Sequence, residues 1–153
     1  MTPAISIRPA APDEAGLLTA LALRSKAHWG YDDAFMAACR DELTLADDEI
    51  VARRTHVAER AGRVLGFSTL EGAPPAGVVG MLFVEPEMIG QGVGGLLMRD
   101  LLGRARSLDF TTLTIDADPD AEPFYLAQGA VRVGTTPSGS IPGRVLPLLE
   151  IRL

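Results

Sequence analysis

Hydrophobic and polar positions along the chain follow two periods that alternate from segment to segment. Apolar residues at every second position, or in short unbroken runs, are typical of β-strands, and such segments are 5–10, 49–59, 63–72, 77–84, 111–116, 130–136 and 144–153. Apolar residues spaced three or four apart predict helices over 12–29, 32–43, from a glycine-rich stretch to about Ser107, and over 120–129. This order predicts an α/β fold with a mixed sheet and helices on its faces.

Turn residues refine this pattern at three places. Ala61 and Gly62 separate two predicted strands and are typical of a tight hairpin turn. The segment 72–77, rich in Gly and Pro, predicts a loop. Gly80 lies inside an apolar strand, where a glycine indicates a β-bulge or the close approach of another backbone.

Length and composition set the class of protein. The chain has 153 residues, which suits one compact domain over 1–153. We expect a cytoplasmic protein, because the first residues do not resemble a signal peptide and no segment approaches the roughly 20 apolar residues of a membrane span. Cys39 is the only cysteine, and His28 and His56 are the only histidines. An internal disulfide and a cysteine-built zinc site are therefore excluded, and we expect no metal.

The charged residues are unevenly distributed along the chain. The net charge is −6 and there is no basic run, so nucleic acid is not an expected partner. Acidic residues are concentrated between positions 32 and 49, namely Asp32, Asp33, Asp41, Glu42, Asp47, Asp48 and Glu49. This concentration could be a solvated helix face, or an acidic rim that attracts a cationic substrate.

The stretch VEPEMIGQGVGGLLMRD, from Val84 to Asp100, holds Gly90, Gly92, Gly94 and Gly95 where a helix should begin. Glycine inside a helix costs about 1 kcal/mol relative to alanine. The start of a helix, however, presents unpaired N–H groups and a partial positive charge to anions. Glycines allow the backbone to approach such an anion closely, so the stretch indicates a pyrophosphate site.

Two other phosphate sites fit less well. The letters GQGVGG match the dinucleotide pattern G-x-G-x-x-G, and Asp116 ends a later strand where a ribose-binding acid would stand. In that fold, however, the glycines follow the strand almost at once, and the residues after Asp116 are too few for a second nucleotide half. A Walker loop is excluded, because no Gly-Lys-Ser/Thr occurs.

The same stretch resembles the acetyl-CoA signature of the GNAT family of N-acetyltransferases. The family pattern runs from a strand end, often Val-x-Pro, into Arg/Gln-x-x-Gly-x-Gly/Ala. Val84 and Pro86 fit, as do Gly92 and Gly94, whereas Ile89 stands at the Arg/Gln position. The change removes a polar side chain near the pyrophosphate and leaves the backbone N–H groups.

A second stretch, DPDAEPFYLAQGA, resembles another motif of that family, Asn-x-x-Ala-x-x-Phe-Tyr-x-x-x-Gly-Phe. Ala121, Phe124, Tyr125 and Gly129 fit, while Asp118 stands at the Asn position. The order of the elements is also similar over essentially the whole chain. The resemblance implies the acyl-CoA N-acyltransferase (GNAT) fold, a mixed and mostly antiparallel sheet with flanking helices.

The resemblance implies how acetyl-CoA would be bound. The strand around Leu82 would splay from the strand 111–116, receive the pantetheine arm in the gap, and offer an N–H to the oxyanion. Gly80 as a bulge would help this splay. The residues expected to bind the cofactor are Leu82, Phe83, Val84, Ile89, Gly90, Gln91, Gly92, Val93, Gly94, Gly95, Asp118 and Tyr125.

The resemblance also implies direct transfer of an acetyl group to an amine. Tyr125 stands where the family places the acid that protonates the departing thiolate. Candidate bases for the amine are Glu85, His28 and Glu71, and Glu85 is preferred because it ends the cofactor strand. His28, Trp29 and Tyr31 are expected near the acceptor. One of the arginines that follow the glycine turn (Arg99, Arg104 and Arg106) could reach the ribose phosphate, although solvated helix arginines would look the same.

The acceptor is expected to be a small-molecule or peptide amine, with no membrane partner. A non-catalytic protein that keeps the fold and binds acyl-CoA is the alternative function. The apolar final strand, 144–153, could pair across a homodimer, although a strand buried within one subunit would have the same sequence pattern.

Overall fold

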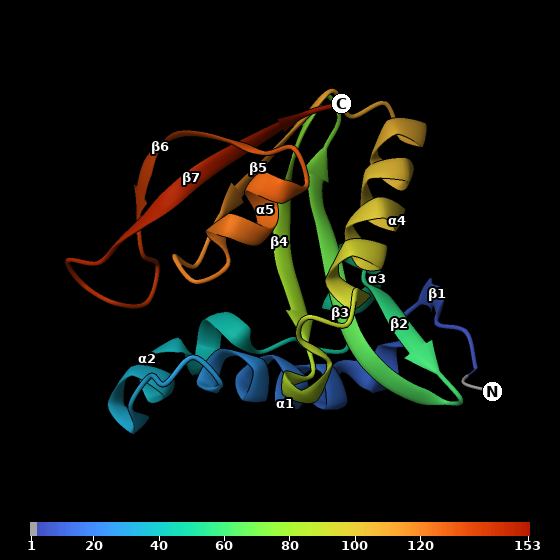
Figure 1. Cartoon of the computed structure of the whole chain (residues 1–153), viewed down its shortest axis with the longest axis horizontal. Helices are drawn as coiled ribbons and strands as arrows, with labels where there is room; N and C mark the ends of the chain where they lie inside the picture. Colours follow the sequence, from blue (N-terminus) through green and yellow to red (C-terminus); the bar gives the residue numbers. More distant parts are fainter. Residues whose placement is uncertain (1–2) are drawn as a thin grey trace.

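The computed structural model of the chain describes residues 3–153, so residues 1 and 2 of the predicted domain lie outside it. Its centre is one mixed sheet of seven strands in the order β1-β2-β3-β4-β5-β7-β6 (Figure 1). The strands are β1 (Ser6–Pro9), β2 (His56–Arg60), β3 (Arg63–Ala73), β4 (Ala76–Val84), β5 (Thr112–Asp116), β6 (Val131–Pro137) and β7 (Val145–Arg152). Only β4 and β5 run parallel, which confirms the mostly antiparallel sheet.

Helices cover both faces of the sheet. On one face, α1 (Ala15–Ala27), α2 (Asp33–Leu43) and α3 (Glu49–Ala52) bury apolar side chains against Val57, Phe67 and Met81. On the other face, α4 (Val93–Ser107) and α5 (Glu122–Ala127) pack on β3, β4 and β5. The 3-10 turns η1 (Pro12–Glu14) and η2 (Pro86–Met88) precede α1 and α4. Burial of both apolar faces is the main force that holds this arrangement together.

The prediction of a strand over 49–59 is wrong in its first half. Residues Glu49–Ala52 form the short helix α3, and the strand begins only at His56. The carboxylate of Glu49 accepts a hydrogen bond from the N–H of Ala46 at 2.9 Å, which helps to start the turn. Ile50 anchors it in the core, and Arg54, with φ of 46°, breaks it before β2. The local capping contact therefore outweighs the alternating pattern.

The turn predictions agree with the structure. Ala61 and Gly62 both have positive φ, as a two-residue hairpin between β2 and β3 requires. The expected loop over 72–77 is shorter than predicted, because β3 extends to Ala73 and β4 starts at Ala76.

Strands β4 and β5 pair only at their beginnings. Their register ends at the pair Val78 and Thr114, and the remainder of β4 has no β5 partner. The pairing of β4 with β3 shifts register next to Gly80, between the pairs Leu70–Val79 and Ser68–Leu82, so one extra residue on β4 forms a β-bulge. The predicted splay and the predicted bulge therefore occur together.

Strand β7 lies between β5 and β6, so it is paired on both sides within one subunit. The strand at this edge of the sheet is β6, and a homodimer formed by strand pairing on this side would use β6 rather than the final strand. Within residues 3–153, no helix is long and apolar enough to cross a membrane.

Candidate active site

The turn before α4 presents a row of unpaired backbone donors. Gly90 and Gly92 adopt φ of 81° and 87°, a left-handed conformation that other residues rarely adopt. Among residues 3–153, no protein acceptor binds the N–H groups of Gly90, Gly92, Val93, Gly94 and Gly95. The partial positive charge at the start of this 15-residue helix adds to them. The turn therefore has the free donors and the helix-start position that are typical of an anion site.

A cavity of about 470 Å³, which we call the α4 cavity, opens in front of this turn. Its walls come from α1, β4, η2, the glycine turn and α5. A Cβ atom on Gly94 would lie 3.1 Å from the ring of Phe124, so the helix start and α5 approach closely only because this residue has no side chain. The cavity is mostly apolar with few polar groups, which is typical of a small-molecule site.

Most of the residues predicted to bind the cofactor line the α4 cavity. They are Leu82, Phe83, Val84, Ile89, Gly90, Gly92, Gly94, Gly95, Asp118 and Tyr125. Val93 is fully buried in the core and offers only its N–H to this site. The N–H of Gln91 is bonded to the carbonyl of Met88 at 3.1 Å, and Gln91 does not line the cavity. These two side chains are therefore not brought to the site.

The residues present fit a CoA thioester. The free N–H groups and the glycine cradle match a diphosphate, and the unpaired edge of β4 matches an extended amide-bearing arm. Ile89 lines the cavity with an apolar side chain at the family's Arg/Gln position. A diphosphate bound at this turn would therefore be held by main-chain N–H groups, without a polar side chain from position 89.

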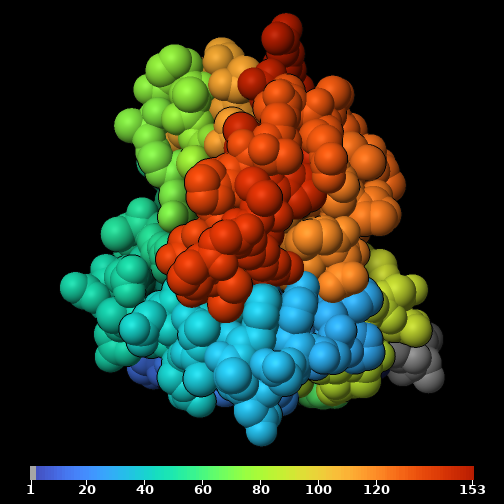
Figure 2. Space-filling model, turned by 90° about the vertical axis from the view of Figure 1, so that its left-hand side faces the viewer, coloured from blue at the N-terminus to red at the C-terminus, as the bar shows by residue number. Residues whose placement is uncertain are grey.

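A second, narrower cavity of about 130 Å³, the splay cavity, lies where β4 and β5 diverge. It shares Lys26, Leu82, Phe83, Asp118, Ala121 and Tyr125 with the α4 cavity. Helix α2 and the β6–β7 loop close it, because the hydroxyl of Ser140 donates to Glu42 at 2.8 Å. Figure 2 shows this loop lying against the segment that contains α2. The two cavities therefore meet at one wall between the sheet halves.

Tyr125 lies on that shared wall. The residue is 6 % exposed, and among residues 3–153 its hydroxyl has no hydrogen-bond partner. Burial, and then the negative charge of Asp118, raise the pKa of Tyr125 above its usual value. The phenol is therefore protonated at neutral pH and free to donate.

Asp118 organises the same wall. Its side chain accepts from the N–H of Asp120 at 2.9 Å, and its carbonyl accepts from Ala121, which begins the turn into α5. Lys26 donates to its carboxylate at 2.7 Å and Tyr31 at 2.8 Å. Burial alone would raise the pKa of Asp118, but these hydrogen bonds lower it below the usual value. A carboxylate thus serves where the family has an amide.

Arg144 completes this network from the β6–β7 loop. It donates to the hydroxyl of Tyr31 at 2.9 Å and lies over the ring of Phe35 at 4.9 Å. Neither Lys26 nor Arg144 could be predicted as part of the site, because their partners are remote along the chain and no local motif marks them. The only available signal was the position of Arg144 in the acceptor-side tail.

The three candidate bases lie in different places. Glu85 is ion-paired with Arg24 at 2.7 Å and lines a different hollow beside β1 and α1. His28 is exposed at the end of α1 and lines neither cavity. Glu71 lies on β3 with its carboxylate directly against Gly80, where a Cβ would overlap it. Thr69 donates to this carboxylate at 2.6 Å, and Arg53 lies 3.2 Å from it.

The expected acceptor residues are separated as well. Trp29 lines the α4 cavity and is 43 % exposed at its mouth. Tyr31 lines neither cavity and donates to the carboxylate of Asp118, which lines both. Arg99 and Arg104 face a third hollow and do not line the α4 cavity, and Arg106 does not line it either. The residues predicted for the cofactor are thus brought together at one cavity, whereas those predicted for the acceptor are not.

Comparisons with known proteins agree with this geometry. The sequence profile described as "Acetyltransferase (GNAT) domain" matches residues 33–138. No protein of curated function matches the sequence. Among solved structures, a GCN5-related N-acetyltransferase from Rhodopseudomonas palustris is 27 % identical with a TM-score of 0.76, covering 100 % of this chain and 97 % of the other.

Two archaeal proteins share the fold at lower identity. PaiA N-acetyltransferase from Thermoplasma acidophilum, solved with coenzyme A, has a TM-score of 0.81 at 16 % identity over 98 % of this chain and 99 % of the other. Ard1 from Thermoplasma volcanium has a TM-score of 0.76 at 19 % identity, covering 98 % of each chain. The profile match covers more than half of the chain, which therefore belongs to the GNAT family and is an acetyltransferase that uses acetyl-CoA.

Proposed function

We propose that residues 1–153 form one N-acetyltransferase domain that moves the acetyl group of acetyl-CoA directly to a primary amine. The observation that supports this proposal is the wall that the α4 cavity and the splay cavity have in common. The α4 cavity and the splay cavity meet beside Tyr125, at the point where β4 leaves β5. A thioester held on one side and an amine held on the other would meet there without a covalent enzyme intermediate.

The main chain would hold the donor. The unpaired N–H groups of the glycine turn would donate hydrogen bonds to the diphosphate oxygens, and the open edge of β4 would pair with the pantetheine amides. An N–H of β4 near Leu82 or Phe83 would polarise the thioester carbonyl. The N–H of Met81 is already bonded to the hydroxyl of Thr69 at 2.9 Å, so it is not that donor.

Tyr125 would stabilise the departing thiolate. As the amine nitrogen bonds to the acetyl carbon, the carbon–sulfur bond breaks and negative charge develops on sulfur. A buried, unpartnered and protonated phenol can donate a hydrogen bond to that sulfur and give up its proton. Because its raised pKa makes the phenol a weaker acid, Tyr125 would give up the proton only once negative charge on sulfur is well developed.

Glu71 is a better placed base than Glu85. Glu85 is held by Arg24 and, at 3.6 Å, by Arg63 in another hollow. Glu71 is also bonded, to Thr69 and Arg53, and it lines neither cavity itself, but its carboxylate lies against Gly80, which lines the splay cavity. We therefore assign Glu71, directly or through one water, the removal of the proton that the amine must lose.

The splay cavity favours a slender, cationic acceptor. Its volume admits little more than the end of a chain. Glu42 lines it and, among residues 3–153, has no basic partner, since its carboxylate accepts from the hydroxyl of Ser140. Of the seven acids between positions 32 and 49, this one supports the acidic-rim interpretation.

Two measurements test the proposal. Calorimetric titration should show coenzyme A binding and no comparable binding of NAD. Thiol release from acetyl-CoA should then accelerate with a primary amine, tested over linear diamines, amino acids and short peptides. Turnover with none of these classes, despite coenzyme A binding, would leave the non-catalytic alternative standing.

The replacement Tyr125→Phe isolates the proposed acid. It should lower kcat by about tenfold to a hundredfold and leave the dissociation constant of coenzyme A nearly unchanged, because the hydroxyl makes no contact that supports the fold. Phe124→Leu serves as the control, since it alters packing against Gly94 and should act on coenzyme A affinity instead. Unchanged kcat in Tyr125→Phe would contradict the assigned role.

A further inference from the structure

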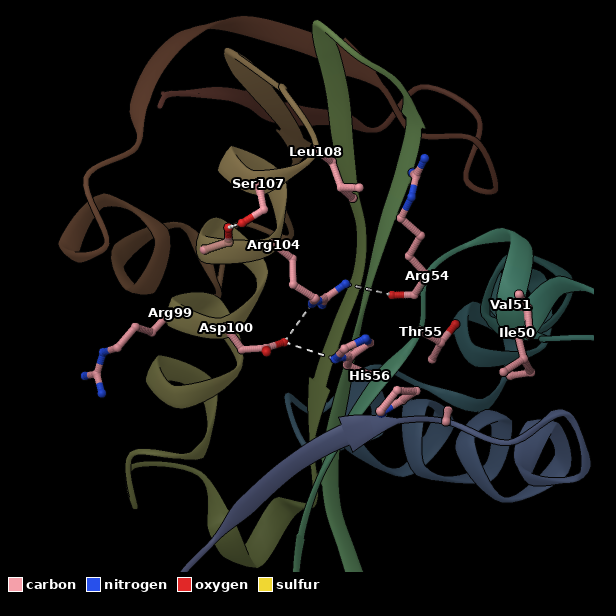
Figure 3. A pocket seen from close by; sticks show the side chains of 13 residues that line it. Ile50, Val51, Arg54, Thr55, His56, Arg99, Asp100, Arg104, Ser107 and Leu108 are labelled. Atoms are coloured by element: carbon pink, nitrogen blue, oxygen red, sulfur yellow. Dashed lines mark hydrogen bonds and ion pairs between the residues drawn. The ribbon is translucent and has the colours of Figure 1, made fainter.

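A third hollow, separate from both cavities, lies beside the C-terminal half of α4. Its volume is about 850 Å³, and its walls come from the end of β1, α3, the start of β2 and α4. Figure 3 shows Arg104 in its middle, with Ile50 and Val51 on one side and Arg99 and Asp100 on the other. It shares no lining residue with the α4 cavity. Because three arginines line it, we name it the basic hollow.

The basic hollow carries positive charge within an acidic chain. Arg54, Arg99 and Arg104 line it against a single acid, Asp100, whereas the whole chain has a net charge of −6. His56 lies 3.3 Å from Asp100. Burial, and then the charge of Arg104, lower the pKa of His56, so the imidazole does not neutralise or add charge at pH 7. Arg104 is paired with Asp100 at 3.0 Å, so the excess positive charge of the hollow is that of Arg54 and Arg99.

Polar atoms without partners concentrate in the same walls. Among residues 3–153, four buried side-chain polar atoms lack a hydrogen bond, and three of them belong to residues that line the hollow. These three are Oγ1 of Thr55, Nη2 of Arg104 and Nδ1 of His56, and because Nδ1 of His56 has Asp100 at 3.3 Å, two of them are without any partner. Thr55 is only 3 % exposed. Native proteins seldom leave such groups unpaired, so their clustering indicates a missing partner.

Arg104 is held so that it can offer this donor. Its Nε donates to Asp100 at 3.0 Å and its Nη1 to the carbonyl of Arg54 at 3.2 Å. These two bonds fix the plane of the guanidinium and leave Nη2 without a hydrogen-bond partner. Apolar side chains, among them Ile50, Val51 and Leu108, form the remainder of the wall. A fixed cation beside an apolar wall suits a ligand that is charged at one end only.

We propose that the basic hollow binds a small organic acid, with one carboxylate on an apolar body. One carboxylate oxygen accepts from Arg104 and the other from the hydroxyl of Thr55, while the body packs on the exposed side chains of Val51 and Leu108. A carboxylate suits this arrangement better than a phosphate, because one fixed guanidinium and one hydroxyl match two oxygens. Binding would also weaken the field that lowers the pKa of His56, so that pKa rises with occupancy.

The two histidines make the test specific. The imidazole signals of His28 and His56 are followed by NMR, with and without saturating coenzyme A, during titration with hexanoate, hexylammonium, hexanol or inorganic phosphate. We expect hexanoate to shift the His56 signal saturably, to raise its pKa and to leave His28 unchanged. Coenzyme A should not displace it, because the α4 cavity is elsewhere.

Matched variants localise the binding. Thr55→Val should weaken hexanoate binding by about tenfold while the fold is kept, since the hydroxyl has no protein partner to lose. Val51→Asp places a negative charge on an exposed position of the wall and should weaken it similarly. Val131→Asp, at an equally exposed position on β6, is the control and should have no effect.

Three results would overturn the proposal. The first is no saturable shift of His56 with hexanoate up to about 10 mM, a concentration that detects even weak sites. The second is equal binding of hexylammonium or hexanol, which would show that charge is not recognised. The third is binding of phosphate as tight as that of hexanoate, which would show a plain anion site without an apolar part.

Discussion

The two ends of α4 present hydrogen-bond donors in opposite ways. At its start, the donors are main-chain N–H groups that are exposed because glycines precede and open the helix. Along its second half, the donors are side chains, and they come from α4 and from the residues before β2. A site made of main chain leaves a local mark in the sequence, whereas a site made of side chains is assembled only by folding. The first is damaged by adding a side chain and the second by removing one.

The largest expected effect follows from adding a side chain at the first site. Gly94→Val would push against the ring of Phe124, which a Cβ would already approach to 3.1 Å, and would fill the cradle for the diphosphate. We expect coenzyme A to bind about a hundredfold more weakly, or about 2.7 kcal/mol, by calorimetry. Gly103→Ala, in the same helix with open space around the new methyl group, should stabilise the protein and leave coenzyme A affinity unchanged. Equal affinity in Gly94→Val and Gly103→Ala would refute the cradle.

The second effect separates the two candidate bases, Glu71 beside the splay cavity and Glu85 in another hollow. Glu71→Gln should lower kcat by about a hundredfold near pH 7, because the amine loses its base. Glu85→Gln should leave kcat within about threefold, although it removes the partner of Arg24 and should lower the free energy of unfolding. The measurement is the pH dependence of kcat for both variants. If Glu85→Gln loses the rate and Glu71→Gln keeps it, the preference for Glu85 from the sequence is restored.

The third effect tests the side-chain site without any ligand. Thr55→Val removes a buried hydroxyl that has no partner, so the free energy of unfolding should rise by about 1–3 kcal/mol in urea titration. Thr69→Val is the matched change, and it should lower stability because the hydroxyl of Thr69 bonds both Met81 and Glu71. A loss of stability in Thr55→Val would show that its hydroxyl is satisfied in solution.

The smallest effect is a pH dependence of stability. The pKa of His56 is lowered in the folded protein, so between that pKa and about 6.5 the unfolded chain binds more protons. Stability from this residue is therefore lost as the pH falls below about 6.5, by no more than about 1.4 kcal/mol per pH unit. Urea midpoints between pH 5.5 and 7.5 should show this slope in the wild type and not in His56→Gln. A slope that persists in His56→Gln would assign it to other groups.

The same contrast explains what the sequence could predict. The glycine turn, the bulge at Gly80 and the motif around Tyr125 depend on neighbours along the chain, and they were predicted correctly as structure. The network of Asp118 joins residues 87 and 92 positions apart, and no local pattern specifies it. The position of Glu85 at the end of a strand favours it as a base in the sequence. In the structure its carboxylate is paired with Arg24 and lines another hollow. Helix α3 was missed because a capping contact from Glu49 outweighs a pattern that fits a strand.

The wall shared by the two cavities has a consequence for the choice of acyl group. A thioester that lies along β4 would end at that wall, so its acyl chain would itself form part of the boundary of the splay cavity. Each methylene added beyond acetyl would take room from a cavity of only about 130 Å³. The enzyme would therefore select its donor and its acceptor by their combined length, accepting a longer acyl chain only with a shorter amine.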